Sequence, residues 1–327
     1  MSYISATSPT IMMDQRPEGL SVQLRKPWPL ALKTATFSLP RPTSGERLPM
    51  DPLGEDFALY ITGFVCLGSH LAGVFLFKHV LPDGAWRRHP QFLAHQMVAL
   101  PLMLVCTYIG CVAWFLPSQE ESAAAATVDG RVHGRTEAGE LLARVVIGAQ
   151  LFWDIPTTAL VPSLYSRLMM GHHVCMILMA IVCITTPYVL YYVPFFAGVI
   201  EVSAIPLAVV DVFHPTRYGE VADNSAVLGA INMACRVLFA GLFLLVRCLY
   251  FPYVMCARVL PDCFAVMSKG VEVVPPVITV FCGVSMMLLQ LHWGSLIVKQ
   301  LKKMMAPPPD PRKEGYAKHQ DEQKVLI

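Results

Sequence analysis

The sequence is short of charge. Only 15% of its 327 residues are Asp, Glu, Lys or Arg, whereas soluble globular domains carry about a quarter. Hydrophobic residues make up 55%, the mean hydropathy is +0.52, and the uncharged residues gather into long runs. These features exclude a soluble enzyme, a disordered scaffold and a collagen-like rod. They predict an all-α, polytopic transmembrane helical bundle.

Two other signatures are absent. The net charge is only +2, and no basic run is interleaved with aromatic residues, so nucleic acid is excluded as a partner. The ten cysteines form no C-x-x-C pair, and most of them lie inside apolar runs. We therefore interpret them as small hydrophobic residues and predict no metal site.

By the criterion of about 20 apolar residues per crossing, the sequence contains about seven spans. They are Phe57–Lys78, Gln91–Leu116, Leu141–Pro162, Leu168–Tyr191, Val193–Phe213, Ala226–Tyr250 and Val274–Val298. Only Tyr191–Pro194 separates the fourth span from the fifth, and a proline there favours a tight hairpin over one long helix. Long connections are expected at Pro117–Glu140 and after Tyr250.

Three regions follow from this pattern: a polar arm over residues 1–50, a transmembrane domain over 51–303 and a disordered tail over 304–327. The arm has no apolar core of a secretory signal. Its basic residues resemble a transit peptide weakly, and a solvated arm is the favoured interpretation. Seven spans put the two ends on opposite sides, and the lysines and arginines near the C-terminus place that end in the cytosol.

Few ionisable residues lie inside the spans. Each costs roughly 2.5–3.5 kcal/mol to insert, so such residues usually face the interior of a bundle. The candidates for a site are His95, Asp154, His172, His173, Glu201 and Arg236. At a rise of about 1.5 Å per residue, all of them fall between the middle and the cytosolic third, within reach of one cavity. Arg247 is expected close enough to the end of span six to snorkel.

Each candidate also has a structural interpretation. His95 alone is more typical of a hydrogen bond between helices than of a site. Asp154 could pair with Arg236 and fix the helix register, and the adjacent His172 and His173 are open to either interpretation. Glu201 stands in an apolar run with no evident structural purpose, which favours a functional role.

The order of these residues resembles the TLC-domain family, which includes the ceramide synthases and smaller TLC domain-containing proteins. The resemblance covers roughly residues 57–303. It rests on Ala94-His95-Gln96, Leu151-Phe-Trp-Asp154, Met169-Met-Gly-His172-His173-Val, Glu201-Val-Ser203 with Pro206, Asn232 with Arg236 and Arg247, and Trp293 before a basic exit. It implies a ring of six helices around a polar-floored cavity, with the first span packed outside.

The sequence departs from the ceramide synthases in the region after the His pair. Those enzymes carry Ser-Tyr and then His-Asp-x-x-Asp, whereas this chain has Thr185-Thr186-Pro187-Tyr188 and Glu201-Val-Ser203. It is therefore similar to the smaller TLC proteins as a divergent relative. Ceramide synthase activity does not carry over.

Three functions stay open from the sequence. The first is a lipid-binding protein of membrane lipid homeostasis, in which His95 and Arg236 help to grip a head group. The second is an acyltransferase with acyl-CoA as co-substrate, in which His172 and His173 act as base or nucleophile and Asp154 or Glu201 orients the ring. The third is a structural subunit of a membrane complex.

The partners that we expect are membrane lipids, with a second copy of the chain or a larger membrane complex as alternatives. No cofactor is expected beyond acyl-CoA in the enzyme reading. The expected location is the endoplasmic reticulum or another endomembrane, ahead of the mitochondrial membrane. The sequence ends Lys-Val-Leu-Ile and so carries no Lys-Asp-Glu-Leu retrieval signal.

Overall fold

A computed structural model describes residues 56–215, 217–270 and 272–305. All of these residues belong to one compact unit. The arm predicted over residues 1–50 lies outside the described residues, as does all of the tail predicted over 304–327 except residues 304 and 305, which belong to a helix. The arm and the rest of the tail stay predictions. Within the described ranges every regular element is a helix.

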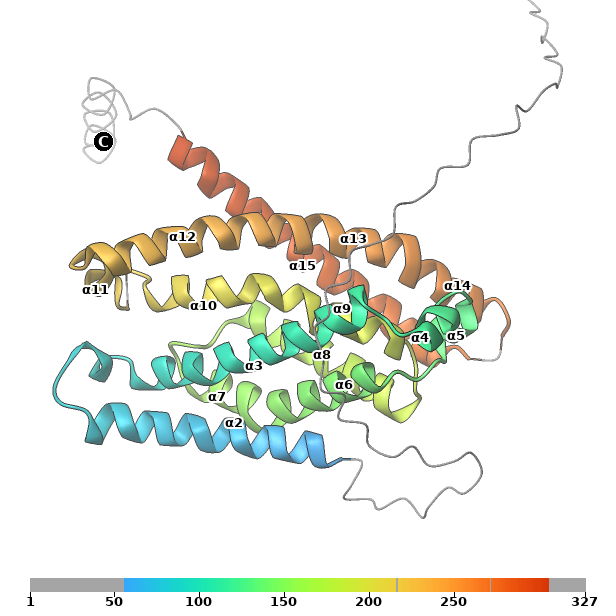
Figure 1. Cartoon of the computed structure of the whole chain (residues 1–327), viewed down its shortest axis with the longest axis horizontal. Helices are drawn as coiled ribbons and strands as arrows, with labels where there is room; N and C mark the ends of the chain where they lie inside the picture. Colours follow the sequence, from blue (N-terminus) through green and yellow to red (C-terminus); the bar gives the residue numbers. More distant parts are fainter. Residues whose placement is uncertain (1–55, 216, 271, 306–327) are drawn as a thin grey trace, which may run out of the picture. The chain divides into compact units, whose positions relative to one another are not determined.

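The first half of the unit runs from α2 to α8 (Figure 1). Its elements are α2 (Phe57–Phe75), η1 (Leu76–Val80), η2 (Ala85–Arg87), α3 (Pro90–Phe115), α4 (Gln119–Ala124), α5 (Val128–Val132), α6 (Glu137–Ala149), η3 (Gln150–Asp154), α7 (Ile155–Leu160) and α8 (Arg167–Thr185). Local sequence sets several of the starts. Pro90 opens α3, and the hydroxyls of Thr136 and Ser166 cap the free amides that begin α6 and α8.

The second half runs from η4 to α15. Its elements are η4 (Leu190–Tyr192), α9 (Val193–Ala197), η5 (Val199–Ser203), α10 (Ala204–Val212), α11 (Gly219–Asp223), α12 (Ala226–Leu242), η6 (Phe243–Tyr250), α13 (Phe251–Val254), η7 (Met255–Val259), α14 (Leu260–Met267) and α15 (Val274–Met305). The stretch predicted as the loop Pro117–Glu140 contains the two short helices α4 and α5.

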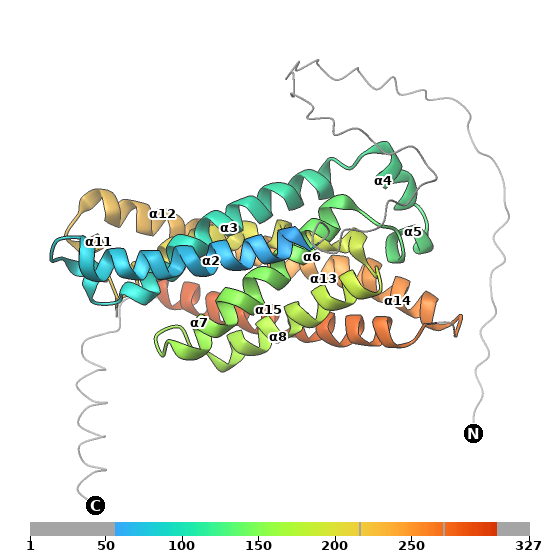
Figure 2. The same ribbon diagram turned by 90° about the horizontal axis from the view of Figure 1, so that it is seen from below.

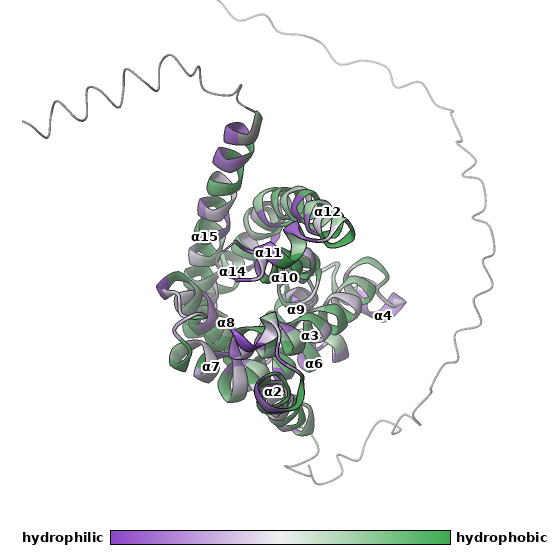
Figure 3. Ribbon diagram, turned by 90° about the vertical axis from the view of Figure 1, so that its left-hand side faces the viewer, coloured by the Kyte–Doolittle hydropathy of each residue, from purple (hydrophilic) through white to green (hydrophobic). Residues whose placement is uncertain are grey.

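The long helices close into a ring. In order around it, α3 packs on α6, α6 on α8, α8 on α15, α15 on η6, α12 on α10, and α10 again on α3. The view along the bundle shows this arrangement, and α2 lies outside it against α3 and α6 (Figures 2 and 3). At one contact α3 and η5 meet at glycines, because a Cβ on Gly198 would lie 2.5 Å from the Cα of Gly110.

Six helices among the described residues are long and apolar enough to cross a membrane, which confirms the predicted class. They are Phe57–Val80, Pro90–Phe115, Arg167–Thr185, Leu190–Val212, Ala226–Met267 and Val274–Lys303. The remaining predicted span corresponds to the continuous run α6–η3–α7. It carries Glu137, Glu140, Arg144 and Asp154, and it packs against α2, α8 and α9 inside the bundle, so it needs less apolar surface.

The long connection predicted after Tyr250 is wrong, because one helical run continues from Ala226 to Met267. Two prolines lie in this run, Pro252 and Pro261, and a π-helical stretch directly precedes each of the short helices that hold them. A proline cannot donate its amide to the preceding turn, and the wider π-helical turn accommodates the missing bond. The helix therefore bends rather than ends.

The hairpin between the fourth and fifth spans lies earlier than predicted. Helix α8 ends at Thr185, and the chain turns through Val189, whose φ of 55° is left-handed. Pro194 does not make the corner, because it occupies the first turn of α9, where proline has no intrahelical amide bond to lose.

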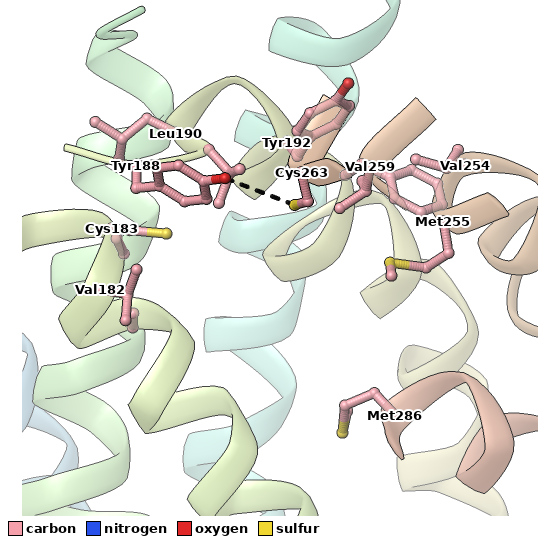
Figure 4. Close-up of a cluster of buried hydrophobic side chains, with 14 of the residues drawn as sticks. Val182, Cys183, Tyr188, Leu190, Tyr192, Val254, Met255, Val259, Cys263 and Met286 are labelled. Carbon is pink, nitrogen blue, oxygen red and sulfur yellow. Dashed lines mark hydrogen bonds between the residues drawn. The ribbon is translucent and has the colours of Figure 1, made fainter. Parts of the chain in front are cut away.

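A cluster of buried hydrophobic side chains fills most of the half of the bundle away from the end of α15. Buried Tyr188, Leu190 and Tyr192 from the hairpin pack against Met255 and Cys263 there (Figure 4). The hydroxyl of Tyr188 donates to the sulfur of Cys263 at 3.7 Å. This core closes one end of the ring and leaves the other end for a cavity.

A buried ion pair ties the α4–α5 excursion to this core. Arg131 donates from Nε and Nη2 to both carboxylate oxygens of Asp262, at 2.7 and 2.6 Å, and the side chain of Asp262 is only 3% exposed. These hydrogen bonds raise the pKa of the Arg131 guanidinium above its usual value. The segment that contains α4 and α5 is thus fixed to the bundle.

If α6–η3–α7 is the seventh crossing, the two ends of the chain lie on opposite sides of the membrane. Protease added to sealed microsomes should then remove a tag placed after Ile327 and spare a tag placed before Met1. Equal protection of the two tags would mean an even number of crossings and would contradict the topology.

Candidate functional site

A cavity of about 500 Å³ lies inside the ring, in the half of the bundle at which α15 ends. Its walls come from α3, α6–η3–α7, α8, η5–α10, α12–η6 and α15. Five of the six candidate residues line it: His95, Asp154, His172, His173 and Glu201. The structure therefore brings together side chains from four separate spans.

Asp154 is the centre of the first polar cluster in the cavity wall. Its Oδ1 accepts hydrogen bonds from His95 Nε2 at 2.9 Å and from Thr158 Oγ1 at 3.2 Å, and its Oδ2 accepts from Gln150 Nε2 at 3.2 Å. The His95 ring also stacks on Trp153, with 4.7 Å between the ring centroids. The carboxylate is thus satisfied, as a buried charge requires, and the imidazole is fixed at its edge and its face.

The adjacent histidines on α8 face different neighbours. His173 is 7% exposed, and its Nδ1 lies 3.4 Å from Asp154 Oδ2, at ion-pair distance but without hydrogen-bond geometry. The ring of His172 lies 6.0 Å from that of Trp293 on α15. Successive helical residues point about 100° apart, so one ring contacts the Asp154 cluster and the other contacts α15.

Arg247 is the centre of the second polar cluster. Its Nε donates to Ser203 Oγ at 2.7 Å, and its two terminal nitrogens donate to Glu201 Oε1 and Gln290 Oε1, each at 3.5 Å. The residue is only 7% exposed. Through it η6 is joined to η5 and to α15, so the cluster fixes three helical segments around the cavity.

The arginine that lines the cavity is Arg247 and not, as predicted, Arg236. Arg247 lies near the middle of the run Ala226–Met267, so it is buried and does not snorkel. Arg236 does not line the cavity, and its Nε donates to Asn232 on its own helix at 3.2 Å. The cationic partner of Glu201 is therefore Arg247, and the proposed pair of Asp154 with Arg236 does not form.

Sequence reasoning also missed Gln150, Trp153, Thr158, Ser203 and Gln290 as parts of the two clusters. Gln290 and Arg247 are recognisable in the sequence as polar residues inside apolar spans, and the same signal marks Gln150. The tryptophan carries no such signal, because it is equally typical of a packed core.

Several buried polar atoms around the cavity have no hydrogen-bond partner within the described ranges. They are Gln150 Oε1, Trp153 Nε1 and the Nδ1 atoms of His95, His172 and His173. A buried polar atom without a partner costs about 1–3 kcal/mol, so each of these atoms would gain from a polar group brought within reach. Within the same ranges, no three His, Cys, Asp or Glu side chains are placed to hold a metal ion.

A second, almost wholly apolar pocket of about 80 Å³ adjoins the cavity and lies among residues of the hydrophobic core. The two share Val146, Met176 and Ala197 in their walls. Cysteines and methionines from α8, η7 and α15 line the far part. The combined space is therefore amphipathic, with the polar clusters at one end and flexible apolar side chains at the other.

The end of the cavity that faces out of the bundle is crossed by Arg217. Its Nη1 lies 2.6 Å from Asp211 Oδ1, and its Nη2 donates to the carbonyl oxygen of Ser163 at 3.4 Å. Its guanidinium carbon also sits 3.7 Å above the centroid of the Phe92 ring. Arg217 therefore joins the α7–α8 turn, α10 and α3 across this end.

Taken together, these features define an integral membrane protein with a polar-walled cavity inside a ring of helices. Comparison with known families matches the TLC domain to residues 92–299, and the chain belongs to this family. No curated protein matches the chain, and no solved structure does. The matched region holds both polar clusters and begins after α2.

The Arg247 cluster should carry much of the stability of the ring. We expect Arg247→Met to lower the free energy of unfolding by about 2–4 kcal/mol, because it leaves the half-buried Glu201 carboxylate and buried Ser203 and Gln290 without this partner. Adding Glu201→Gln should restore part of the loss. Thermal unfolding in detergent measures both.

The matched control is Arg236→Met, which removes a half-buried arginine from the same helical run. Since the one hydrogen bond of Arg236 to another described residue is to Asn232 on its own helix, its loss should cost far less. Equal effects at the two positions would contradict the structural role of Arg247.

Proposed function

We propose that this TLC-domain protein binds a lipid in its intramembrane cavity and acts in membrane lipid homeostasis. The observation that carries the proposal is the amphipathic character of the two adjoining spaces: a cavity walled by two polar clusters, around Asp154 and Arg247, and an apolar pocket next to it. A lipid has the same amphipathic character. Its polar part would meet unpaired atoms such as Trp153 Nε1, and a hydrocarbon segment would fill the apolar part.

The volume of the cavity supports the proposal. About 500 Å³ lies within the range of 300–1,000 Å³ that is typical of small-molecule sites. Both polar clusters are held by several hydrogen bonds from different helices. Such a site is preorganised, so little further ordering is needed when a ligand binds.

A second candidate function is acyl transfer with acyl-CoA as co-substrate. The observation that favours it is the position of His173, whose Nδ1 faces Asp154 Oδ2 at 3.4 Å. With the proton on Nδ1, the carboxylate orients the ring and leaves Nε2 as the basic nitrogen. That nitrogen would take the proton of a hydroxyl or amine as it attacks the thioester, and would return it to the departing thiolate.

Replacing His172 and His173 distinguishes lipid binding from acyl transfer. The test compares the lipid profiles of cells that carry wild type or the double variant His172→Gln/His173→Gln at matched protein levels. If the protein binds lipid, the variant should weaken binding by about 1–2 kcal/mol, because it replaces two hydrogen-bonding rings by shorter amides, and a reduced effect on lipid composition should remain. If it transfers acyl groups, turnover should fall by about 10²–10⁴-fold.

The control is His79→Gln/His292→Gln, which changes two exposed histidines. A His172/His173 variant that loses only thermal stability, with lipid effects that track the amount of folded protein, would favour a structural subunit. A variant identical to wild type in lipid profile and stability would rule out lipid binding and acyl transfer at this pair together.

A further inference from the structure

Helices α12 and α15, which form neighbouring walls of the ring, diverge beside the cavity. Helix α15 packs closely on η6, where a Cβ on Gly294 would lie 2.3 Å from the sulfur of Cys248. Beyond this contact α15 diverges from α12 towards its C-terminal end (Figures 1 and 3). The ring is therefore tightly closed at η6 and wider between α12 and α15.

The cavity reaches this divergence. Phe239 and Phe243 line it from the α12–η6 side, and Trp293 lines it from α15. Next to these side chains, Leu238 on α12 and Leu291 on α15 are exposed, as residues in contact with lipid tails are. Aromatic side chains thus line the cavity on both sides of the divergence, and we call the space between them the side passage.

The two ways out of the cavity differ in chemistry. The outward-facing end is crossed by Arg217, which pairs with Asp211 and bonds to Ser163. Within the described ranges no hydrogen bond or ion pair crosses between α12 and α15. At the closed contact, Arg247 and Cys248 of η6 bond to Gln290 of α15. Widening the ring between α12 and α15 beyond that contact would break no hydrogen bond or ion pair between the described residues of these two helices, whereas opening the end would break those of Arg217.

The volume also favours the side passage. A cavity of about 500 Å³ is too small for a whole two-chain lipid, so part of such a ligand must stay outside. Hydrocarbon chains are stable in the bilayer and not in water, and only the side passage leads directly into the bilayer.

We propose that the cavity opens sideways to the bilayer between α12 and α15, and that a phospholipid lies with its oxygen-rich polar part in the cavity and its chains over Phe239, Phe243 and Trp293. This inference rests on the proposed lipid-binding function and deepens it. It gives the ligand class and the direction from which the ligand arrives.

The unpaired atoms of the cavity favour an oxygen-rich ligand. Trp153 is 2% exposed, and its Nε1, which can only donate, has no partner. The Arg247 guanidinium also lines the cavity, from η6, and holds Glu201 and Gln290 only at 3.5 Å. Phosphate and ester oxygens accept such bonds, and those from arginine are charge-assisted and strong.

The passage can be tested by photo-cross-linking of the full chain in phosphatidylcholine vesicles that contain phosphatidylcholine with a diazirine in one acyl chain. Phe243 is only 4% exposed, so a lipid outside the bundle cannot reach it, whereas Phe264 on the same helical run is 55% exposed and reports surrounding lipid. We expect adducts at both. Adducts at Phe264 without adducts at Phe243 would overturn the passage.

Two variants test the polar end and the route. Trp153→Phe keeps an aromatic ring, though a smaller one, and removes the donor. It should lower the Phe243 adduct by about fivefold, because one hydrogen bond contributes that order of affinity. Arg217→Ala opens the other end and should leave the Phe243 adduct unchanged. The Phe264 adduct should stay constant in both variants and so controls for folding. A Phe243 adduct that ignores Trp153→Phe, or one that rises with Arg217→Ala, contradicts the proposal.

Native mass spectrometry of the same samples distinguishes failure of the side passage from failure of lipid binding itself. A bound phospholipid without a Phe243 adduct would overturn the side passage and leave lipid binding standing. Neither a bound lipid nor an adduct would overturn both.

Discussion

The structure depends on keeping two charges paired inside a membrane. Asp154 and Arg247 lie within helical runs of the bundle, where an unpaired charge would be costly. Each is satisfied by donors or acceptors from other helices: Asp154 by His95 on α3, and Arg247 by Glu201 on η5. These bonds fix how the helices sit around the ring, and they also place the polar groups on the cavity wall.

Both charges occur in π-helical stretches that directly precede a proline-containing turn. Asp154 ends η3, which Pro156 follows in α7, and Arg247 lies in η6, which Pro252 follows in α13. A wider turn rotates the following side chains relative to a regular α-helix. The same local feature therefore accommodates the proline and turns a charged residue towards the cavity, which links helix geometry to the site.

The sequence predicts the class of fold because it follows from apolar runs of spanning length, and six such helices are present. It also places five candidate residues in one cavity, since charges in spans usually face the interior. Which of Arg236 and Arg247 lines the cavity could not be predicted from the sequence. Both are arginines in one apolar run, and the decision depends on where the helix ends, which the π-helical stretch before Pro252 extends to Met267. Trp153, which packs like a core residue, gave no signal of its unpaired donor.

The central claim is that the cavity holds a lipid, and the most direct measurement is a cryo-electron microscopy map of the wild-type chain in phospholipid nanodiscs. The account predicts elongated density with one end against Asp154, His173 and Arg247 and with the rest leaving through the side passage or filling the apolar pocket. A well-resolved cavity that contains only isolated water-sized peaks, with both polar clusters intact, would contradict it.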